Sequence, residues 1–154
     1  MKRVLVPIDF SEVTDVLLDA LNTFDIGPKK VYLLHAIEHD IGSLSGFGVD
    51  PHPGTDEDVE QKGLFERRVK ELTDKGLDVV PLFRQGAPLD VILEAAEEYD
   101  VDLIMVGSHG HGALYDLVAG TVSQGVIHKA HRPVLLIPSP RPEPAEKEPE
   151  VTPY

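Results

Sequence analysis

Residues 107–123 carry the side chains and the spacing with the clearest chemical potential in this sequence. The stretch is rich in glycine, contains His109 and His111, and ends with Thr121 and Ser123. Glycines let backbone N–H groups approach phosphate oxygens because no Cβ stands in the way. The two hydroxyl side chains fall at the predicted start of a helix, whose first N–H groups also favour anions. The pattern favours phosphate binding, although a tight turn followed by a capped helix would give the same residues.

The same stretch lacks a fixed positive charge, because no lysine or arginine occurs between Arg84 and Lys129. The charge of a bound phosphate would be met by backbone N–H groups, by the helix dipole, by Mg²⁺ or another divalent cation that the ligand carries, and by His109 or His111. Phosphoryl-transfer enzymes normally place a lysine or arginine against the transferred group. We therefore expect at most slow hydrolysis or self-phosphorylation, and we assign no catalytic residue.

The histidines also invite a metal-site interpretation. His109 and His111 lie in one predicted loop, and His35 and His39 flank the end of a predicted strand. No acidic or thiol side chain completes a recognisable ligand set around them. Scattered loop histidines are usually solvated, so the sequence predicts no metal site formed by protein side chains.

Short apolar runs and helical patterns alternate along the chain. The runs are typical of buried strands; strands are expected at residues 4–8, 31–37, 79–83, 103–106 and 134–137, and helices at 12–24, 56–75, from 88 onward and at 121–130. This alternation predicts an α/β fold, a single doubly wound, Rossmann-like parallel sheet with helices on both faces. Ligands of such sheets bind outside the carboxyl ends of the strands, where Asp9 and residues 107–123 fall.

Particular side chains lead to three local structural expectations. Ser11 is the better N-cap of the first helix, which frees Asp9 to face the crevice between strands. Pro81 lies inside the third strand and predicts an edge position, because proline cannot donate to a ladder. The inward face of the second helix is expected to comprise Val59, Phe65, Val69 and Leu72.

Composition limits the classes of function. The 154 residues carry a formal net charge of -13, contain no cysteine and are 42% hydrophobic. An acidic surface disfavours nucleic-acid backbones and anionic membranes, and no apolar run approaches the roughly 20 residues that span a bilayer. We expect a cytoplasmic protein with one domain over residues 1–138. Residues 139–154 form a Pro/Glu-rich tail with too few apolar side chains to offset the entropy of ordering.

Gly107, Gly110, Gly120 and Thr121 match the motif G-x2-G-x9-G-[ST], and in this the chain resembles the ATP-binding universal stress proteins. The resemblance extends over the domain and includes that family's first, second and last strands with their flanks, at residues 6–11, 33–37 and 132–138. It implies a five-stranded sheet in the order 3-2-1-4-5, with ATP between strands 1 and 4.

The resemblance also implies a set of ATP-binding residues. Residues up to Gly107 would border the adenine and ribose, and residues from Gly110 onward would hold the phosphates. The expected set is Pro7, Ile8, Asp9, Ala36, Val106, Gly107, His109, Gly110, Gly120, Thr121, Val122 and Ser123. The family commonly forms homodimers through the last strand, here residues 134–138, and a hydrophobic strand at a sheet edge needs a partner or cover on physical grounds as well.

Three rival classes fit less well. Tyr115 occupies the third glycine position of a dinucleotide-binding motif, no G-K-[ST] of a P-loop occurs, and the third strand is followed by Arg84 and Gln85 where a receiver domain needs an aspartate. One alternative stays open, namely a nucleotide-independent signalling or scaffold protein of the same fold that acts through its dimer surface.

Overall fold

Strands and helices alternate through the part of the chain that the structure describes. The computed structural model describes residues 2–24, 30–38, 56–108 and 121–139. Within them the elements are β1 Arg3–Pro7, α1 Glu12–Thr23, β2 Lys30–Ile37, α2 Asp56–Asp74, β3 Val79–Gln85, α3 Pro88–Glu98, β4 Leu103–Gly107, α4 Thr121–Lys129 and β5 Val134–Ile137. The predicted order of elements is therefore confirmed, with small shifts at their ends.

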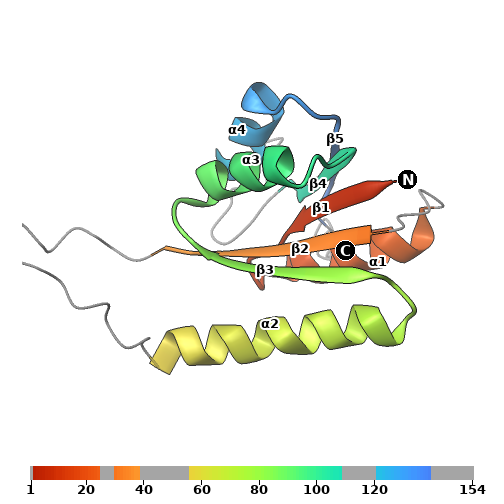
Figure 1. Ribbon diagram of the computed structural model, residues 1–154, viewed down its shortest axis with the longest axis vertical. Coiled ribbons are helices and arrows are strands. Elements are labelled where there is room, and N and C mark those ends of the chain that lie inside the picture. Colours follow the sequence, from red (N-terminus) through yellow and green to blue (C-terminus); the bar gives the residue numbers. More distant parts are fainter. Residues whose placement is uncertain (1, 25–29, 39–55, 109–120, 140–154) are drawn as a thin grey trace, which may run out of the picture.

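The five strands form one parallel sheet in the order β3-β2-β1-β4-β5, which confirms the predicted fold class and strand order. β1 lies at the centre of the sheet (Figure 1). The chain moves outward from β1 through β2 and β3, and then returns to the other side of β1 for β4 and β5. Open α/β sheets have their ligand crevice at such a reversal, which here falls between β1 and β4.

The ladder between β1 and β4 is shorter than the strands that form it. It ends at the pair Leu5–Ile104, although β1 continues to Pro7 and β4 continues to Gly107. On its other side β1 stays paired with β2 as far as Pro7–Leu34. The carboxyl ends of β1 and β4 therefore lie beyond their last shared ladder pair.

Pro7 gives the physical reason for the early end of this ladder. Along β1 the backbone groups face the two neighbouring strands in turn: the Arg3 carbonyl accepts the Asp102 N–H on the β4 side, and the Ile8 N–H donates to Leu34 on the β2 side. Pro7 lies an even number of residues after Arg3 and so presents its backbone nitrogen toward β4. Proline has no N–H, and the ladder cannot continue there.

Apolar side chains fill the space between the sheet and the helices on each face. Leu17 and Phe65 belong to the cluster that α1 and α2 cover, and Ile92 and Val126 belong to the cluster that α3 and α4 cover. The two pairs of helices lie on opposite faces of the sheet (Figure 1). Each fully buried aliphatic or aromatic side chain contributes about 1.5–3 kcal/mol, so both faces stabilise the fold.

The predicted inward face of α2 was wrong at Val59, whose side chain is 67% exposed. Phe65 and Leu72 are buried as predicted, and Val69 packs against their cluster. At 100° per residue, Val59 points about 120° away from Phe65 around the helix axis. Gln61 lies on the inward side in its place and is half-buried.

α1 packs against β4 at a distance that only glycine permits. A Cβ added to Gly107 would lie 1.9 Å from Cγ1 of Val13 and 3.2 Å from its Cβ. Val13 is buried, and a β-branched side chain has little rotamer freedom in a helix. A side chain at position 107 would therefore push α1 away from the sheet.

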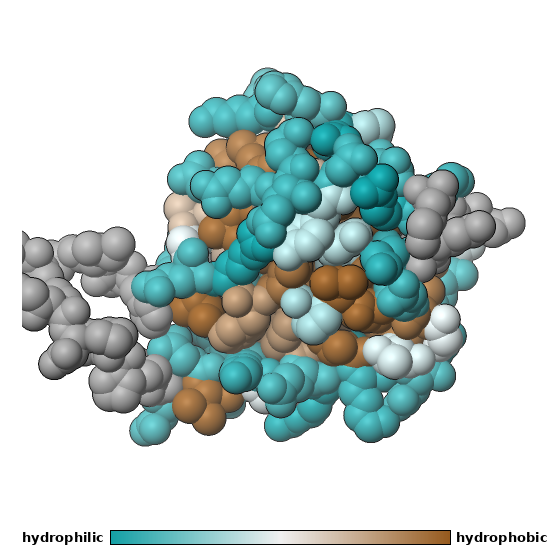
Figure 2. Space-filling model, viewed as in Figure 1, coloured by the Kyte–Doolittle hydropathy of each residue, from teal (hydrophilic) through white to brown (hydrophobic). Residues whose placement is uncertain are grey.

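β3 and β5 form the two edges of the sheet. Pro81 is exposed in the middle of β3, which confirms the predicted edge position. Apolar residues gather along β3 between the hydrophilic surfaces of α2 and α3 (Figure 2). At the other edge, most residues of β5 are only half-buried. No helix in the described residues is long and apolar enough to cross a membrane.

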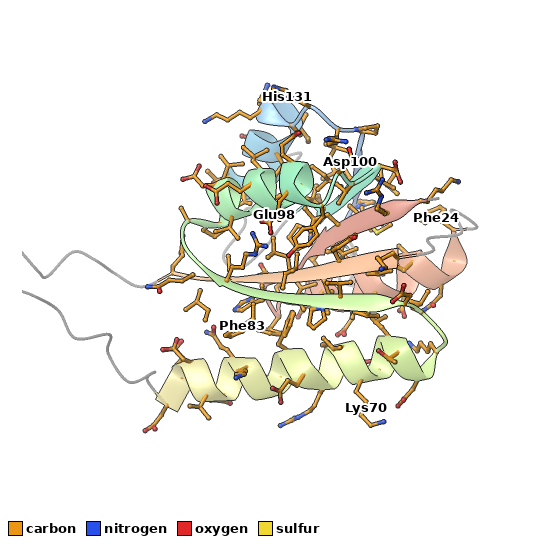
Figure 3. All side chains as sticks on the ribbon, in the orientation of Figure 1. Phe24, Lys70, Phe83, Glu98, Asp100 and His131 are labelled. Atoms are coloured by element: carbon orange, nitrogen blue, oxygen red, sulfur yellow. The ribbon has the colours of Figure 1, made fainter. Side chains whose placement is uncertain are left out.

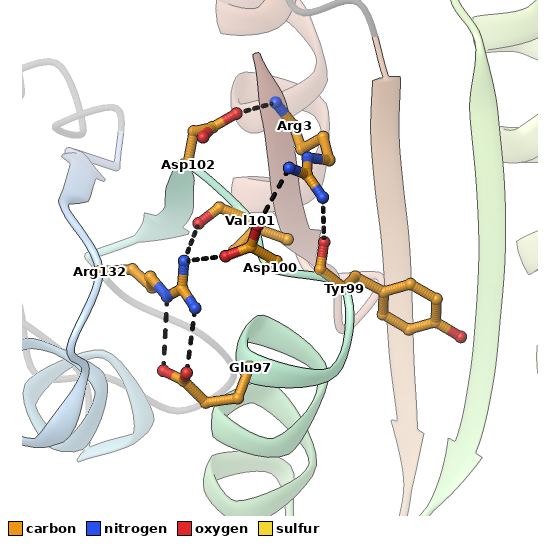
Figure 4. A network of polar contacts seen from close by, with 7 residues as sticks. All are labelled: Arg3, Glu97, Tyr99, Asp100, Val101, Asp102 and Arg132. Atoms are coloured by element: carbon orange, nitrogen blue, oxygen red, sulfur yellow. Dashed lines mark hydrogen bonds and ion pairs between the residues drawn. The ribbon is translucent and has the colours of Figure 1, made fainter. Parts of the chain in front are cut away.

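A polar network joins the elements at the amino edge of the sheet (Figure 4). Asp100 follows α3 in the left-handed region, with φ of 47°, and its carboxylate accepts from Arg3 at 3.0 Å and from Arg132 at 2.7 Å. Arg132 also donates to both carboxylate oxygens of Glu97. These bonds to Arg132 hold the pKa of the Glu97 and Asp100 carboxyls below their ordinary values. The network ties β1, the end of α3 and the residues before β5 together.

We expect Gly107→Ala to lower the free energy of unfolding by about 1–3 kcal/mol, the usual cost of overpacking a filled core. Urea unfolding measures the change. Val13→Ala removes the clashing methyl group. It should therefore lower the free energy of unfolding less in the Gly107→Ala background than in the wild-type background.

Gly63 in α2 is the matched control, because a Cβ there meets nothing within 4 Å. Gly63→Ala should stabilise the protein by roughly 0.5–1 kcal/mol, as alanine does in a helix interior. Equal losses for Gly107→Ala and Gly63→Ala would contradict the packing argument.

We expect Arg132→Met to weaken the fold at neutral pH and to flatten its dependence on acid. The lowered carboxyl pKa values mean that the pairs stabilise the fold above the ordinary pKa of about 4, and that this contribution is lost as the pH falls through the lower, folded-state values. Urea unfolding from neutral pH to about pH 3 tests this. The control is Arg67→Met, which removes one exposed charge from α2; a similar acid profile for both variants would contradict the role given to Arg132.

Candidate functional site

The turn after β1 places Asp9 at the carboxyl edge of the sheet. Asp9 is exposed, and its Oδ1 accepts the Ser11 N–H at 3.0 Å and the Ser11 hydroxyl at 2.5 Å. Phe10 between them has φ of 59°, in the left-handed region. Ser11 is the N-cap residue of α1, as predicted, but its side chain makes no cap bond to the helix. The bond from the Ser11 N–H to the Asp9 carboxylate is that of an Asx turn, and the left-handed residue between them also brings the Ser11 hydroxyl to the same oxygen.

Three predicted site residues share one face of the sheet near this edge. Pro7, Ala36 and Val106 each lie two residues beyond a member of the cluster that α3 and α4 cover, and side chains of a strand return to the same face at every second residue. Val106 is buried and Ala36 is half-buried. Their side chains are small and apolar, which suits the face of a flat ring. Ile8 is buried on the opposite face, against α1 and α2.

Three hydrogen bonds hold the end of β4. The Ser123 hydroxyl of α4 donates to the Gly107 carbonyl, and the Ser108 N–H donates to Ile137 of β5 at 2.9 Å. The Ser108 hydroxyl accepts the Ser139 N–H at 2.8 Å. With Val13 of α1 against Gly107, the end of β4 is fixed in place. The single hydroxyl proton of Ser123 serves this contact, so Ser123 can offer a phosphate only its backbone N–H.

The first turn of α4 has the electrostatics of an anion site. Thr121 and Val122 are exposed there, and the turn contains no acidic residue, whereas α1, α2 and α3 each carry at least one aspartate or glutamate in the first turn. The positive end of a helix dipole therefore faces outward uncompensated by its own side chains. His109, Gly110 and Gly120, which were expected to complete the phosphate half, lie outside the described residues.

His35 is buried next to the Asp9 turn, which the sequence did not predict. It was grouped with solvated histidines at a strand end, but it is buried in β2, and its ring contacts the Ile8 carbonyl and the Gln61 side chain. The signal was present in the alternation of the strand, because Val31, Leu33 and His35 share a face. No cluster of three or more metal-ligating side chains occurs in the described residues.

Comparison with known proteins gives one consistent family. The model of the universal stress protein family matches residues 1–138. The chain is 33% identical to universal stress protein MJ0577 of Methanocaldococcus jannaschii, covering 88% of this chain and 94% of that protein. It is 30% identical to universal stress protein YxiE of Bacillus subtilis, covering 88% and 97%.

Solved structures agree with this result. The MJ0577 structure superposes with a TM-score of 0.75 at 28% identity, covering 92% of this chain and 98% of that one. The structure of the universal stress protein from Archaeoglobus fulgidus in complex with dAMP superposes with a TM-score of 0.60 at 25% identity, covering 88% and 97%. The sheet order, the carboxyl-edge geometry and these matches lead to one conclusion: this chain belongs to the universal stress protein family.

Proposed function

We propose that this protein binds ATP at the carboxyl edge of the sheet, between β1 and β4, and that occupancy of the site is a regulatory signal in a stress response. The observation that carries the proposal is the early end of the β1–β4 ladder at Leu5–Ile104. It falls at the reversal of strand order, where open α/β sheets bind ligands, and the glycine motif follows directly after β4.

The described residues fit the two ends of an adenine nucleotide. Pro7, Ala36 and Val106 present small apolar side chains on one face, as a purine ring requires. Asp9 is exposed at this edge, and a carboxylate accepts hydrogen bonds from hydroxyl groups such as those of a ribose. Phosphates would meet the N–H groups at the start of α4, together with His109, Gly110 and Gly120. Mg²⁺ would arrive with the nucleotide.

A relative supports the choice of base. The universal stress protein from Archaeoglobus fulgidus, 25% identical, was solved in complex with dAMP, an adenine nucleotide. ATP in place of a monophosphate is proposed because the motif continues beyond Gly107 through Gly110 to Gly120 and Thr121. The absence of lysine and arginine between Arg84 and Lys129 favours binding with little or no hydrolysis.

A homodimer through residues 134–138 is part of the proposal. β5 is an edge strand whose Val134, Leu135 and Leu136 are only half-buried, and an apolar edge of this kind favours pairing with another chain. The same edge supports the second candidate function, a nucleotide-independent scaffold that acts through its dimer surface. In either case we propose a protein of the cytoplasm, with partners other than nucleic acid or membranes.

We expect the wild-type protein, freed of co-purified nucleotide, to bind ATP with Mg²⁺ in the micromolar range in a calorimetric titration. Pro7→Val supplies the missing N–H toward β4, so the ladder can extend and narrow the crevice. We expect ATP binding to weaken by about tenfold, while the free energy of unfolding stays equal or rises, as an added hydrogen bond would predict.

Pro81→Val is the matched control, since it changes the same residue type in the edge strand β3. It should leave ATP binding unchanged. Failure of nucleotide-free wild-type protein to bind ATP would overturn the proposed site and leave the scaffold function as the better reading.

We expect light scattering to give the molar mass of a dimer for the wild-type protein and that of a monomer for Val134→Lys. A charged side chain on the edge strand β5 opposes its pairing with the same strand of a second chain. Val80→Lys on β3, the other edge, should remain dimeric. A monomeric wild-type protein, or dissociation by both substitutions, would contradict pairing through β5.

A further inference from the structure

His35 lies in the interior at the place where β1 ends. It is 6% exposed, on the face of β2 that α1 and α2 cover. Its ring centroid is 4.5 Å from that of Phe10, 5.5 Å from that of Phe83 and 6.5 Å from that of Phe65. Phe83 lies between β3 and α2 (Figure 3). A polar ring in such apolar surroundings must have its hydrogen bonds satisfied by the protein.

Both ring nitrogens of His35 have a partner on another element. Nδ1 lies 2.9 Å from the Ile8 carbonyl oxygen, and Nε2 lies 3.0 Å from Oε1 of Gln61 on α2. A carbonyl oxygen only accepts, so Nδ1 carries the proton. The other ring nitrogen, Nε2, contacts the Gln61 side chain and thereby ties the ring to α2.

These contacts lie immediately before and after Asp9. The Ile8 carbonyl is the backbone group that precedes Asp9, and the Phe10 ring belongs to the residue that follows it. Phe10 is held at φ of 59°, a conformation that a residue with a Cβ keeps only when its surroundings impose it. His35 contacts both sides of this turn, through a hydrogen bond and through ring packing.

We propose that His35 is a positioning residue for the nucleotide site: it fixes the Ile8 carbonyl and the Phe10 ring, and thereby sets where the Asp9 carboxylate is presented. The inference rests on the proposed function for its ligand. Gln61 orients the imidazole from α2, so the Asp9 turn is held by the second strand and the second helix as well as by its own chain.

Two substitutions at His35 separate the hydrogen bond from the packing. His35→Leu fills the buried position with an apolar side chain and removes both polar contacts, and we expect the dissociation constant of ATP with Mg²⁺ to rise about tenfold. His35→Asn places an amide N–H near the position of Nδ1 and should bind ATP within about threefold of wild type. Phe83→Leu, which removes an aromatic neighbour without touching β1, is the control and should leave ATP affinity unchanged. Circular dichroism and thermal unfolding establish that each variant is folded.

Hydrogen exchange of the Ser11 N–H gives a readout without nucleotide, because that N–H donates to the Asp9 carboxylate at 3.0 Å. We expect exchange to be about tenfold faster in His35→Leu than in wild type, and near the wild-type rate in His35→Asn and Phe83→Leu. Wild-type exchange in His35→Leu, or equal effects of His35→Leu and His35→Asn, would overturn the positioning role. If wild-type protein binds no ATP, the proposed function fails, and the exchange rates alone decide whether His35 positions the turn.

Discussion

The missing N–H of Pro7 is the constraint on which the carboxyl edge of this sheet depends. A parallel sheet covered on both faces gains from pairing every backbone group of its central strands, since buried groups have no water as an alternative partner. Pro7 removes one donor from the β4 side of β1, and the ladder between these strands stops at Leu5–Ile104. The early end of this ladder is therefore built into the sequence of β1, before any loop contributes.

Beyond the last ladder pair, β1 and β4 are not paired with each other. The carboxyl end of each strand is held instead by its other neighbours. β1 continues along β2 to Pro7–Leu34, and the turn that follows is fixed by contacts with His35. β4 is held by α1, α4 and β5 through Gly107, Ser123 and Ser108. These holding contacts use backbone groups, hydroxyls and one imidazole. The ion pairs around Arg132 and Asp100 stand at the opposite, amino edge of the sheet.

The fold could be predicted because its signals are local and repeated. Runs such as residues 4–8 and 103–106 are apolar and separated by helical patterns, and that alternation admits few topologies. Pro81 identified an edge strand because a proline is excluded from a central ladder. Val59 was misplaced because apolarity was weighed above helical phase, while the half-buried Gln61 holds the inward position that the phase assigns.

The fine geometry of the site could not be predicted, because it depends on a left-handed backbone at Phe10 and on contacts between distant residues. A sequence shows Asp9 and Ser11 as separate polar side chains. Only the turn at Phe10, with φ of 59°, brings the serine hydroxyl to the aspartate. The contacts of His35 could not be predicted either, since its partners Ile8 and Gln61 are far from it in the chain. Residues that contact a ligand can be recognised from a sequence motif. A residue that positions them, such as His35, is visible in the sequence only as a polar side chain at a strand position where the alternation predicts an apolar one.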